Sequence, residues 1–388
     1  MKVALLAPLP PLQNGIADYA HAWRAALRDA GVDVVVPASG EDGGWDTRDA
    51  AFWQDVDLVH AQLGGGRGPE FVALEQLRAR WPKLATSATV HDPERLVWRS
   101  PDPAKGLARK AAAWPRPLPQ LLALAGDRNT LARERRLAAG LDAMVTLTRT
   151  GAACLAERMR VDPDRVHFIA HGNPALPPSP LPTGAGVRLL YFGFIYPGKG
   201  IEDLFDALAL VRRDRAQAGF TLTMAGGSAP ELAFGSRGNY VAQLQERARS
   251  LGIADMLQWR LDLPETAIVD CVQSHHAMVL PYRDSRKLAL LGRMRGTSGA
   301  LSWANACGRG VIASDARAFA EELSHGNGVV FAQGNSQALA QCISALVDAP
   351  ALAGDWAGKA TALGKRRQWS TIAQEFSDLF AATVEAKR

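Results

Sequence analysis

Short apolar runs and amphipathic stretches alternate along the whole chain. In the first half, apolar runs typical of buried strands lie at residues 2–7, 32–36, 56–62, 84–91, 143–147 and 166–170. Between the first two runs, residues 19–30 carry apolar side chains at helical spacing and end at Gly31. This alternation predicts a parallel, doubly wound α/β sheet.

A proline-rich segment then divides the chain. Residues 171–186, HGNPALPPSPLPTGAG, contain five prolines and three glycines. Beyond them the pattern repeats, with expected strands at 189–192, 221–225, 257–260, 277–280, 310–314 and 329–331. We therefore predict two Rossmann-like domains, at 1–175 and 176–365, and a terminal helical segment at 366–388 that packs back on the first domain. Ligands are expected in a cleft faced by the carboxyl ends of both sheets.

The bulk composition is that of a soluble globular protein. The chain has 388 residues, enough for two domains, with 47% hydrophobic and 21% charged residues. No apolar run approaches the roughly 20 residues that span a bilayer, and the N-terminal MKVALLAPLPP reads as a first strand rather than a signal peptide. Four dispersed cysteines without a CxxC pair favour reduced thiols, a cytoplasmic location and no metal site.

The most informative segment is the strand, loop and helix at residues 189–211. Its glycine-rich loop brings Lys199 and free backbone N–H groups to the end of a strand and the start of a helix. Such an arrangement suits a phosphate or diphosphate. Strand–loop–helix turns are also common where nothing binds, so the residues alone leave both readings open.

Positive charge gathers between Arg95 and Arg136, and the whole chain has a net charge of +5. The segment reads either as a solvated helical face with a loop or as a monotopic surface for anionic lipid or a lipid-linked substrate. No nucleic-acid-binding motif accompanies the charge, so nucleic acid is not an expected partner. Its members, interleaved with aromatic residues, are Arg95, Trp98, Arg99, Lys105, Arg109, Lys110, Trp114, Arg116, Arg128, Arg133, Arg135 and Arg136.

Six segments, in order, resemble those of family-4 glycosyltransferases of the GT-B fold. They are APLPPLQNGIADYA (7–20), the HG of residues 171–172, FGFIYPGKGI (192–201), LTMAGG (222–227), WANACGRGVIASD (303–315) and HGNGVVF (325–331). The resemblance implies two Rossmann-like domains, acceptor-side at 1–175 and donor-side at 176–365. It also implies retaining, metal-independent transfer from a nucleotide-diphospho-sugar to a glycan or lipid-linked acceptor, with no further cofactor.

The chain departs from that family at the donor site. The family's two glutamates, eight positions apart, align with Arg295 and Trp303, and its first-strand arginine aligns with Phe194. A ribose-binding carboxylate and one diphosphate cation are thus missing. Arg295 could restore the charge, Thr297 or Ser298 could cap the following helix, and Gly299 allows close approach.

The resemblance assigns roles to single residues. His91 faces the donor sugar as the catalytic candidate, and the donor-binding set is Gly15, Gly193, Lys199, Gly226, Arg295, Thr297, Ser298, Gly299 and Glu322. On the acceptor side stand Asp18, which is more simply a helix cap, and Gln62, with His60 beside it. His275 and His276 are expected to pack in the core. No residues are assigned to a metal.

Two readings of the function remain open on this evidence. The first is a cytoplasmic glycosyltransferase at the inner face of the cell membrane, acting in polysaccharide biosynthesis. The second is a catalytically silent GT-B protein that serves as a binding partner in glycan assembly. Sugar-nucleotide epimerases share the fold but lack the KGI loop wording, so they rank third.

Overall fold

The computed structural model describes residues 1–388 except 13, 39–43, 65–67, 98–114, 116–117, 185, 216–218, 228–233, 236–237 and 285–291, and only the backbone of 118–126, 234–235 and 238. The chain forms two compact units. The N-terminal unit contains residues 1–170, 286–297 and 369–388, and the C-terminal unit contains residues 171–285 and 298–368.

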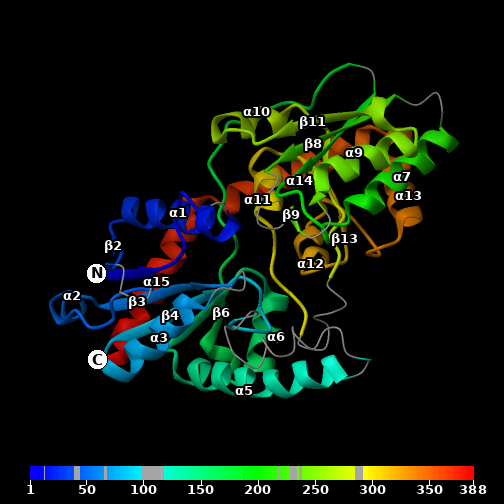
Figure 1. Cartoon of the computed structure of the whole chain (residues 1–388). Coiled ribbons are helices and arrows are strands. Elements are labelled where there is room, and N and C mark those ends of the chain that lie inside the picture. Colours follow the sequence, from blue (N-terminus) through cyan, green and yellow to red (C-terminus); the bar gives the residue numbers. More distant parts are fainter. Residues whose placement is uncertain are drawn as a thin grey trace. The chain divides into compact units, whose positions relative to one another are not determined.

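The N-terminal unit is built on a parallel six-stranded sheet in the order β2-β1-β3-β4-β5-β6 (Figure 1). All six strands expected from the sequence are confirmed. They are β1 (Lys2–Leu6), β2 (Asp33–Val35), β3 (Leu58–Leu63), β4 (Ala85–Val90), β5 (Ala143–Thr146) and β6 (Val166–Phe168).

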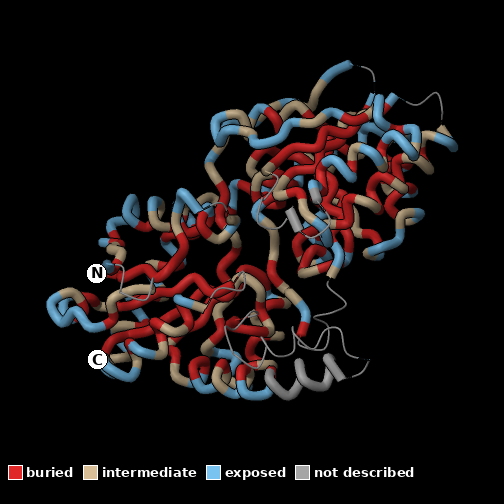
Figure 2. Tube along the Cα trace, viewed as in Figure 1, coloured by how far each residue is buried: buried red, intermediate tan, exposed pale blue. Residues whose placement is uncertain are grey.

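Apolar side chains project from both faces of this sheet, and each face packs against its own hydrophobic cluster. Val3 and Leu5 of β1 pack with α1 (Gly15–Asp29) and α15 (Trp369–Lys387), whereas Ala4 and Leu6 join the opposite cluster. That second cluster draws its helical residues from α2 (Ala50–Gln54), α3 (Pro69–Arg80), α5 (Leu118–Gly140) and α6 (Arg149–Met159). Figure 2 shows the strands as a buried layer between more exposed helices.

The C-terminal unit repeats this plan with a parallel sheet in the order β11-β8-β7-β12-β13-β14. Its six expected strands are also confirmed, as β7 (Val187–Phe192), β8 (Phe220–Gly226), β11 (Leu257–Leu261), β12 (Ala277–Leu280), β13 (Gly310–Ser314) and β14 (Gly328–Phe331). Strand β9 (Phe234–Gly235) pairs antiparallel with β10 (Gly238–Asn239).

Two groups of helices accompany this second sheet. In one group α7 (Ile201–Asp214) contacts α9 (Tyr240–Ser250) and α13 (Ser336–Asp348). In the other, α11 (Gly299–Ala306) contacts α10 (Ile268–Gln273) and α14 (Ala351–Arg366), and α12 (Phe319–Leu323) lies beside β13 and β14. Single 3₁₀ turns occur at Pro163–Arg165, Ala254–Met256 and Glu265–Ala267.

The limits of the units differ from the domain bounds expected from the sequence. The proline-rich linker falls in the C-terminal unit, and residues 286–297, from the donor half of the sequence, fall in the N-terminal unit. Helix α15 packs against α1 and β4 of the N-terminal unit. Within the described part of the chain, no helix combines the length and apolar character needed to cross a bilayer.

The first helix begins four residues earlier than the sequence pattern indicated. The side chain of Asn14 accepts hydrogen bonds from the N–H groups of Ile16 and Ala17, at 3.1 and 2.9 Å, so Asn14 is the N-cap of α1. Asp18 lies in the first helical turn, and our expectation that it caps the helix is wrong. Its carboxylate there still complements the positive end of the helix dipole.

Candidate functional site

The C-terminal unit has a topological switch point between β7 and β12. These two strands are neighbours, but the chain leaves β7 toward β8 on one side and leaves β12 toward β13 on the other. Ligands of open α/β sheets bind at such a point, outside the carboxyl ends of the strands. Here the loop carrying Lys199 follows β7, and residues 281–284 follow β12.

Two glycines bring the backbone of β7 and β8 unusually close at this edge. Gly193 and Gly226 have φ angles of +128° and +137°. A Cβ on Gly226 would lie only 2.1 Å from the carbonyl oxygen of Gly193. Neither turn could therefore carry a side chain without moving or straining the backbone.

The lysine loop is fastened onto the segment that follows β12. Gly200, with φ at +68°, is the N-cap of α7, and a Cβ there would lie 1.8 Å from the carbonyl oxygen of Pro281. The N–H of Arg283 donates to the carbonyl of Gly198 at 3.3 Å, and the Arg283 guanidinium pairs with the buried Asp203. The lysine loop and residues 281–283 are therefore held together as one rigid piece of backbone.

Tyr282 lies at the centre of this piece, and the sequence analysis did not single it out. Its side chain is buried, with Lys199 Nζ 3.7 Å from the ring centroid and its own hydroxyl 3.2 Å from Ser298 Oγ. Burial raises the pKa of the Tyr282 hydroxyl, so this group stays protonated at neutral pH. An aromatic residue after a strand at the switch point was the signal that could have found it.

Ser298 is the N-cap residue of α11, but its hydroxyl bonds no N–H group of that helix. The expected side-chain cap from Ser298 is therefore wrong, and Thr297 belongs to the N-terminal unit instead. The first N–H groups of α11 remain available beside Gly299, whose added Cβ would lie 3.9 Å from His171 Nε2. Trp303, further along α11, packs partly buried against the hydrophobic core.

Glu322 is buried and engaged within the protein. Its Oε2 accepts a hydrogen bond from Arg367 Nη1 at 2.6 Å, and the residue is 1% exposed. Burial raises the pKa of this carboxyl, while Arg367 opposes that shift. The ion pair links the C-terminus of α14 to α12. This is a structural role, whereas the sequence predicted that Glu322 contacts the donor.

Arg295 lies in the N-terminal unit rather than beside the lysine loop. Its guanidinium is 3.3 Å from Glu94 Oε1, and its carbonyl accepts from Thr148 Oγ1 at 2.9 Å. The other Glu94 oxygen accepts from the N–H of Arg293 at 2.7 Å. The carboxylate therefore offsets the charge of Arg295, whose expected service to a diphosphate stays a prediction.

His91 and Gln62 come together at the carboxyl edge of the first sheet. His91 Nε2 lies 2.8 Å from Gln62 Oε1, and the His91 ring meets Tyr19 edge-on at 4.8 Å. Gln62 is 1% exposed, and its amide nitrogen has no hydrogen-bond partner among the described residues. Gly296 approaches the same place, since a Cβ there would lie 2.0 Å from the His91 carbonyl.

His60 is a core residue, so its expected place on the acceptor side is wrong. Both ring nitrogens are occupied, by Ser87 Oγ at 2.8 Å and Thr89 Oγ1 at 2.9 Å, and Trp23 stacks on the ring. Burial lowers the pKa of His60 to about 3. Gly15, the first residue of α1, has nothing within 4 Å of an added Cβ and is open to its surroundings.

His275 and His276 pack in the core as expected. His275 Nε2 lies 2.7 Å from Thr223 Oγ1, and His276 Nδ1 accepts from the N–H of Arg188 at 3.0 Å. Both histidines are buried. In the described parts of the chain, no three His, Cys, Asp or Glu side chains are grouped so that they could hold a metal ion.

Part of the basic segment proves to be internal. Arg95 is 1% exposed, with Glu134 and Asp127 at 3.0 and 2.9 Å from its guanidinium, so its assignment to a surface is wrong. Arg128 and Arg136 are exposed. Seven members lie outside the described residues, namely Trp98, Arg99, Lys105, Arg109, Lys110, Trp114 and Arg116.

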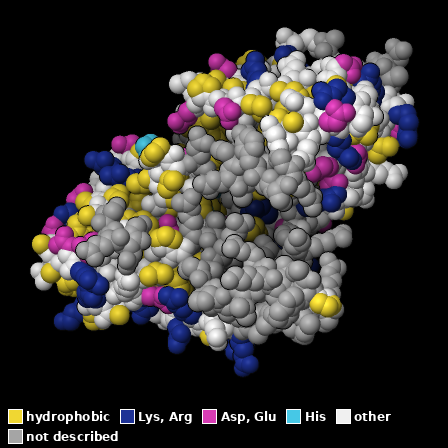
Figure 3. All heavy atoms as spheres, viewed as in Figure 1, with side chains coloured by type: hydrophobic (Ala, Val, Ile, Leu, Met, Phe, Trp, Pro, Cys, Tyr) yellow, Lys and Arg dark blue, Asp and Glu magenta, His cyan; other side chains and the backbone are white. Residues whose placement is uncertain are grey.

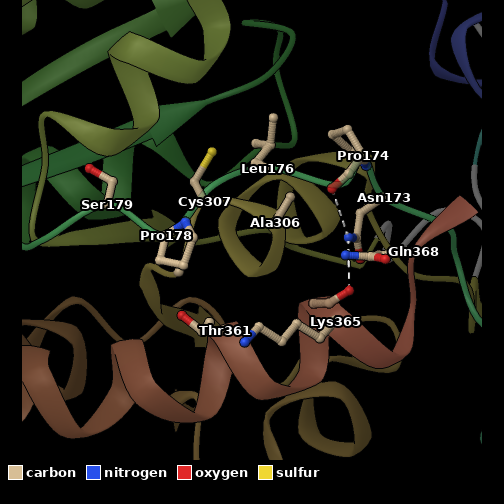
Figure 4. A pocket seen from close by; sticks show the side chains of 12 residues that line it. Asn173, Pro174, Leu176, Pro178, Ser179, Ala306, Cys307, Thr361, Lys365 and Gln368 are labelled. Carbon is tan, nitrogen blue, oxygen red and sulfur yellow. Dashed lines mark hydrogen bonds between the residues drawn. The ribbon is translucent and has the colours of Figure 1, made fainter.

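A small cavity at the other edge of the second sheet is not a donor site. It is lined by Asn173, Cys307, Thr361 and Lys365 among others, and residues 306–308 lead into the amino end of β13 (Figure 4). Asn173 Nδ2 donates to the carbonyl of Gly364 at 3.0 Å, while Asn173 Oδ1 is buried without a partner among the described residues. The cavity of about 20 Å³ has room for a single water.

Comparison with known proteins places this geometry in context. Residues 186–349 match the family described as glycosyl transferases group 1. No curated protein sequence matches the chain at a significant level. The fold is similar to that of sucrose-phosphate synthase from Thermosynechococcus elongatus, with TM-score 0.69, 16% identity and coverage of 100% of both chains.

Two further structures are similar over almost the same length. Anabaena HepE in complex with UDP-glucose gives TM-score 0.67 at 16% identity, over 98% of this chain and 100% of HepE. WaaG, a glycosyltransferase involved in lipopolysaccharide biosynthesis, gives TM-score 0.60 at 12% identity, over 98% of this chain and 99% of WaaG. With its two parallel six-stranded sheets the chain has the GT-B fold, and residues 186–349 of its C-terminal half match the group 1 glycosyl transferases.

Proposed function

We propose that the protein transfers a sugar from a nucleotide-diphospho-sugar to a glycan or lipid-linked acceptor. The observation that carries this proposal is the meeting of two anion-binding elements in the C-terminal unit. Lys199 and the N-terminus of α11 both contact Tyr282, the lysine through the ring and Ser298 through the hydroxyl. The complexes of HepE with UDP and UDP-glucose support a nucleotide sugar as the donor class.

The chemistry follows from how charge develops during transfer. When the bond to the sugar breaks, negative charge grows on the leaving diphosphate. A fixed ammonium and free helical N–H groups stabilise that charge more than they stabilise the intact donor, which lowers the barrier. Lys199 and α11 supply these groups without a metal, and we propose metal-independent transfer with retention of the anomeric configuration, with His91 orienting the donor sugar.

The experiment measures nucleotide binding with a matched charge control. UDP, GDP, ADP and UDP-glucose are titrated into the wild-type protein and Lys199→Ala by calorimetry. We expect one nucleotide family to bind and Lys199→Ala to weaken it about tenfold or more, because a charge-assisted hydrogen bond is lost. Lys359→Ala, which removes an exposed lysine on α14, should leave affinity unchanged. If no nucleotide binds at millimolar concentration, the proposal fails.

A second candidate is a silent GT-B protein that binds a partner. It is favoured by the partly buried Trp303 and by the engagement of Glu322 with Arg367 and of Arg295 with Glu94. The positions that align with the family's two glutamates hold Arg295 and Trp303, so the usual pair of carboxylates is missing. Nucleotide binding with no release of UDP or GDP in the presence of any acceptor glycan would support this candidate.

We also propose that the N-terminal unit serves the acceptor and meets an anionic membrane surface. The support is the positive charge of the chain and the exposed Arg128 and Arg136 of α5. On the face drawn in Figure 3, basic and acidic side chains are interspersed on both units. Binding to vesicles containing anionic lipid should fall steeply with salt, and equal binding to neutral vesicles would contradict the proposal.

A further inference from the structure

One side chain, that of Tyr282, connects the lysine loop to the start of α11. Lys199 Nζ lies 3.7 Å from its ring centroid, and Ser298 Oγ lies 3.2 Å from its hydroxyl oxygen. A cation above an aromatic ring is attracted by the negative face of the ring at distances up to about 6 Å. Lys199 is therefore well inside the range at which the ring fixes the position of its ammonium.

Tyr282 is itself held firmly. It is 4% exposed, its carbonyl accepts a hydrogen bond from Ser314 Oγ at 2.6 Å, and its ring centroid lies 5.4 Å from that of Phe319. The neighbouring Pro281 and Arg283 are fastened to the lysine loop, as described above. A side chain so confined can set the position of a flexible lysine, because it loses little rotamer freedom when a ligand arrives.

The hydroxyl groups of Tyr282 and Ser298 have one O–H donor more than their mutual hydrogen bond uses. Tyr282 and Ser298 each carry one O–H group, and the hydrogen bond between them uses only one of the two. Whichever residue donates, the other O–H can point to a third group. Ser298 is more exposed than Tyr282, so donation from Tyr282 to Ser298 leaves the serine O–H directed outward beside the α11 N-terminus.

We propose that Tyr282 is the positioning residue for the donor diphosphate. Its ring holds the Lys199 ammonium, and its hydroxyl orients Ser298 Oγ, so that lysine and serine reach the same anionic group. A Cβ on Gly193 would lie 3.6 Å from the Tyr282 hydroxyl, which places that hydroxyl at the open turn after β7. This inference rests on the proposed function and deepens it, since it names what aligns the two phosphate-binding groups.

The test is a double-mutant cycle read by UDP affinity, in calorimetry, and by kcat and KM. Tyr282→Phe keeps the ring and loses the hydroxyl, and we expect UDP to bind about two- to tenfold more weakly. Tyr282→Leu loses the ring as well and should weaken UDP binding by a further factor of about two to thirty. The further loss should vanish in the Lys199→Ala background, because the ring acts through the lysine.

Full additivity of Tyr282→Leu and Lys199→Ala would overturn the inference, since a merely structural role would not depend on the lysine. If Tyr282→Leu does not fold, the cycle is run with Tyr282→Phe and Ser298→Ala, which should also be coupled, and additivity there overturns it equally. Tyr240→Phe, which removes a buried hydroxyl that donates to Glu202 at 2.7 Å, is the control with unchanged affinity. Wild-type protein that binds no UDP or other nucleotide contradicts the proposed function itself, a separate result.

Discussion

The two sheets have similar topologies but offer different chemistry at their carboxyl edges. At the second sheet, a lysine, two hydroxyls and a helix N-terminus come together around Tyr282. At the first sheet, the corresponding groups are already paired with one another, His91 with Gln62 and Glu94 with Arg295. The second edge is therefore suited to an anion, whereas the charged and polar groups described at the first edge balance one another.

Buried ion pairs give the largest expected difference between the units. In the N-terminal unit Arg95 holds both Glu134 and Asp127, and in the C-terminal unit Arg367 holds Glu322 alone. Arg95→Met removes the guanidinium that faces two buried carboxylates and should lower the free energy of unfolding by about 3–5 kcal/mol in urea denaturation. Arg367→Met should cost less, because it removes the cation from one buried carboxylate rather than two, and burial raises the pKa of that carboxyl.

A matched double variant checks this cause. Arg95→Met combined with Glu134→Gln should recover part of the lost stability, since one unpaired charge is then removed. If Arg367→Met lowers the free energy of unfolding as much as Arg95→Met does, the number of carboxylates that lose their cation does not explain the difference between the units.

The second prediction compares Gly200, at the end of the lysine loop, with Gly15, which the family resemblance assigned to the donor. Gly200→Ala places a Cβ 1.8 Å from the carbonyl oxygen of Pro281 at a positive φ, so we expect a loss of stability of more than about 2 kcal/mol and loss of nucleotide binding. Gly15→Ala meets no atom within 4 Å and should leave stability unchanged. Thermal unfolding and calorimetry measure both, and an undisturbed Gly200→Ala protein would show that the lysine loop is not fixed as described.

The third prediction concerns acid. Burial lowers the pKa of His60 to about 3 and that of His275 to about 4. In the unfolded chain the histidine pKa is near 6.5, so below that pH the unfolded chain binds protons that the folded chain does not bind. Stability contributed by these neutral histidines is thus fully present above pH 6.5 and falls as the pH drops toward 3 or 4.

The slope is the measurable quantity, at about 1.4 kcal/mol per pH unit for each histidine. His60→Gln should flatten the fall in urea-denaturation stability between pH 6 and 4. His21→Gln, at an exposed position of α1, should keep the wild-type slope. An unchanged slope in His60→Gln would mean that His60 is protonated in the folded protein.

The smallest expected effect is on turnover and is specific to the N-terminal unit. His91→Ala should lower kcat about tenfold while leaving UDP affinity as it is, because the donor sugar loses an orienting contact and the diphosphate does not. Gln62→Met, which removes only the 2.8 Å hydrogen bond to His91, should have a weaker effect in the same direction. A fall in UDP affinity instead of kcat would move His91 out of its proposed role.

Both sheets could be predicted from the sequence because their strands are short apolar runs, and such a run is recognised from neighbouring residues alone. The lysine loop was also identified from the residues, whereas the turn glycines after β7 and β8 came from the family resemblance. Asp18 was mistaken for a cap because Asn14, four residues earlier, lies outside the apolar periodicity that marked the helix. Arg95 was mistaken for a surface residue because its partners, Asp127 and Glu134, lie more than 30 positions away.

The site itself depended on contacts between distant parts of the chain. Arg295 was assigned to the donor from its alignment with a family glutamate and as a substitute for the cation missing at Phe194, yet Glu94, 201 positions earlier, pairs with it in the N-terminal unit. Tyr282 carries no motif of its own and gains its position only from the pairing of β7 with β12. Periodicity and turn chemistry report on neighbours in sequence, so such contacts were out of their reach.

The return of α15 to the first sheet has a consequence for how the protein is made. Phe376 and Phe380 of this helix are fully buried beside Trp23 and His60 in the N-terminal core. A ribosome delivers the first sheet early and α15 after both sheets have been synthesised. During that interval the core beside α1 lacks the aromatic side chains of α15, so this face of the N-terminal unit is fully packed only after α15 has docked.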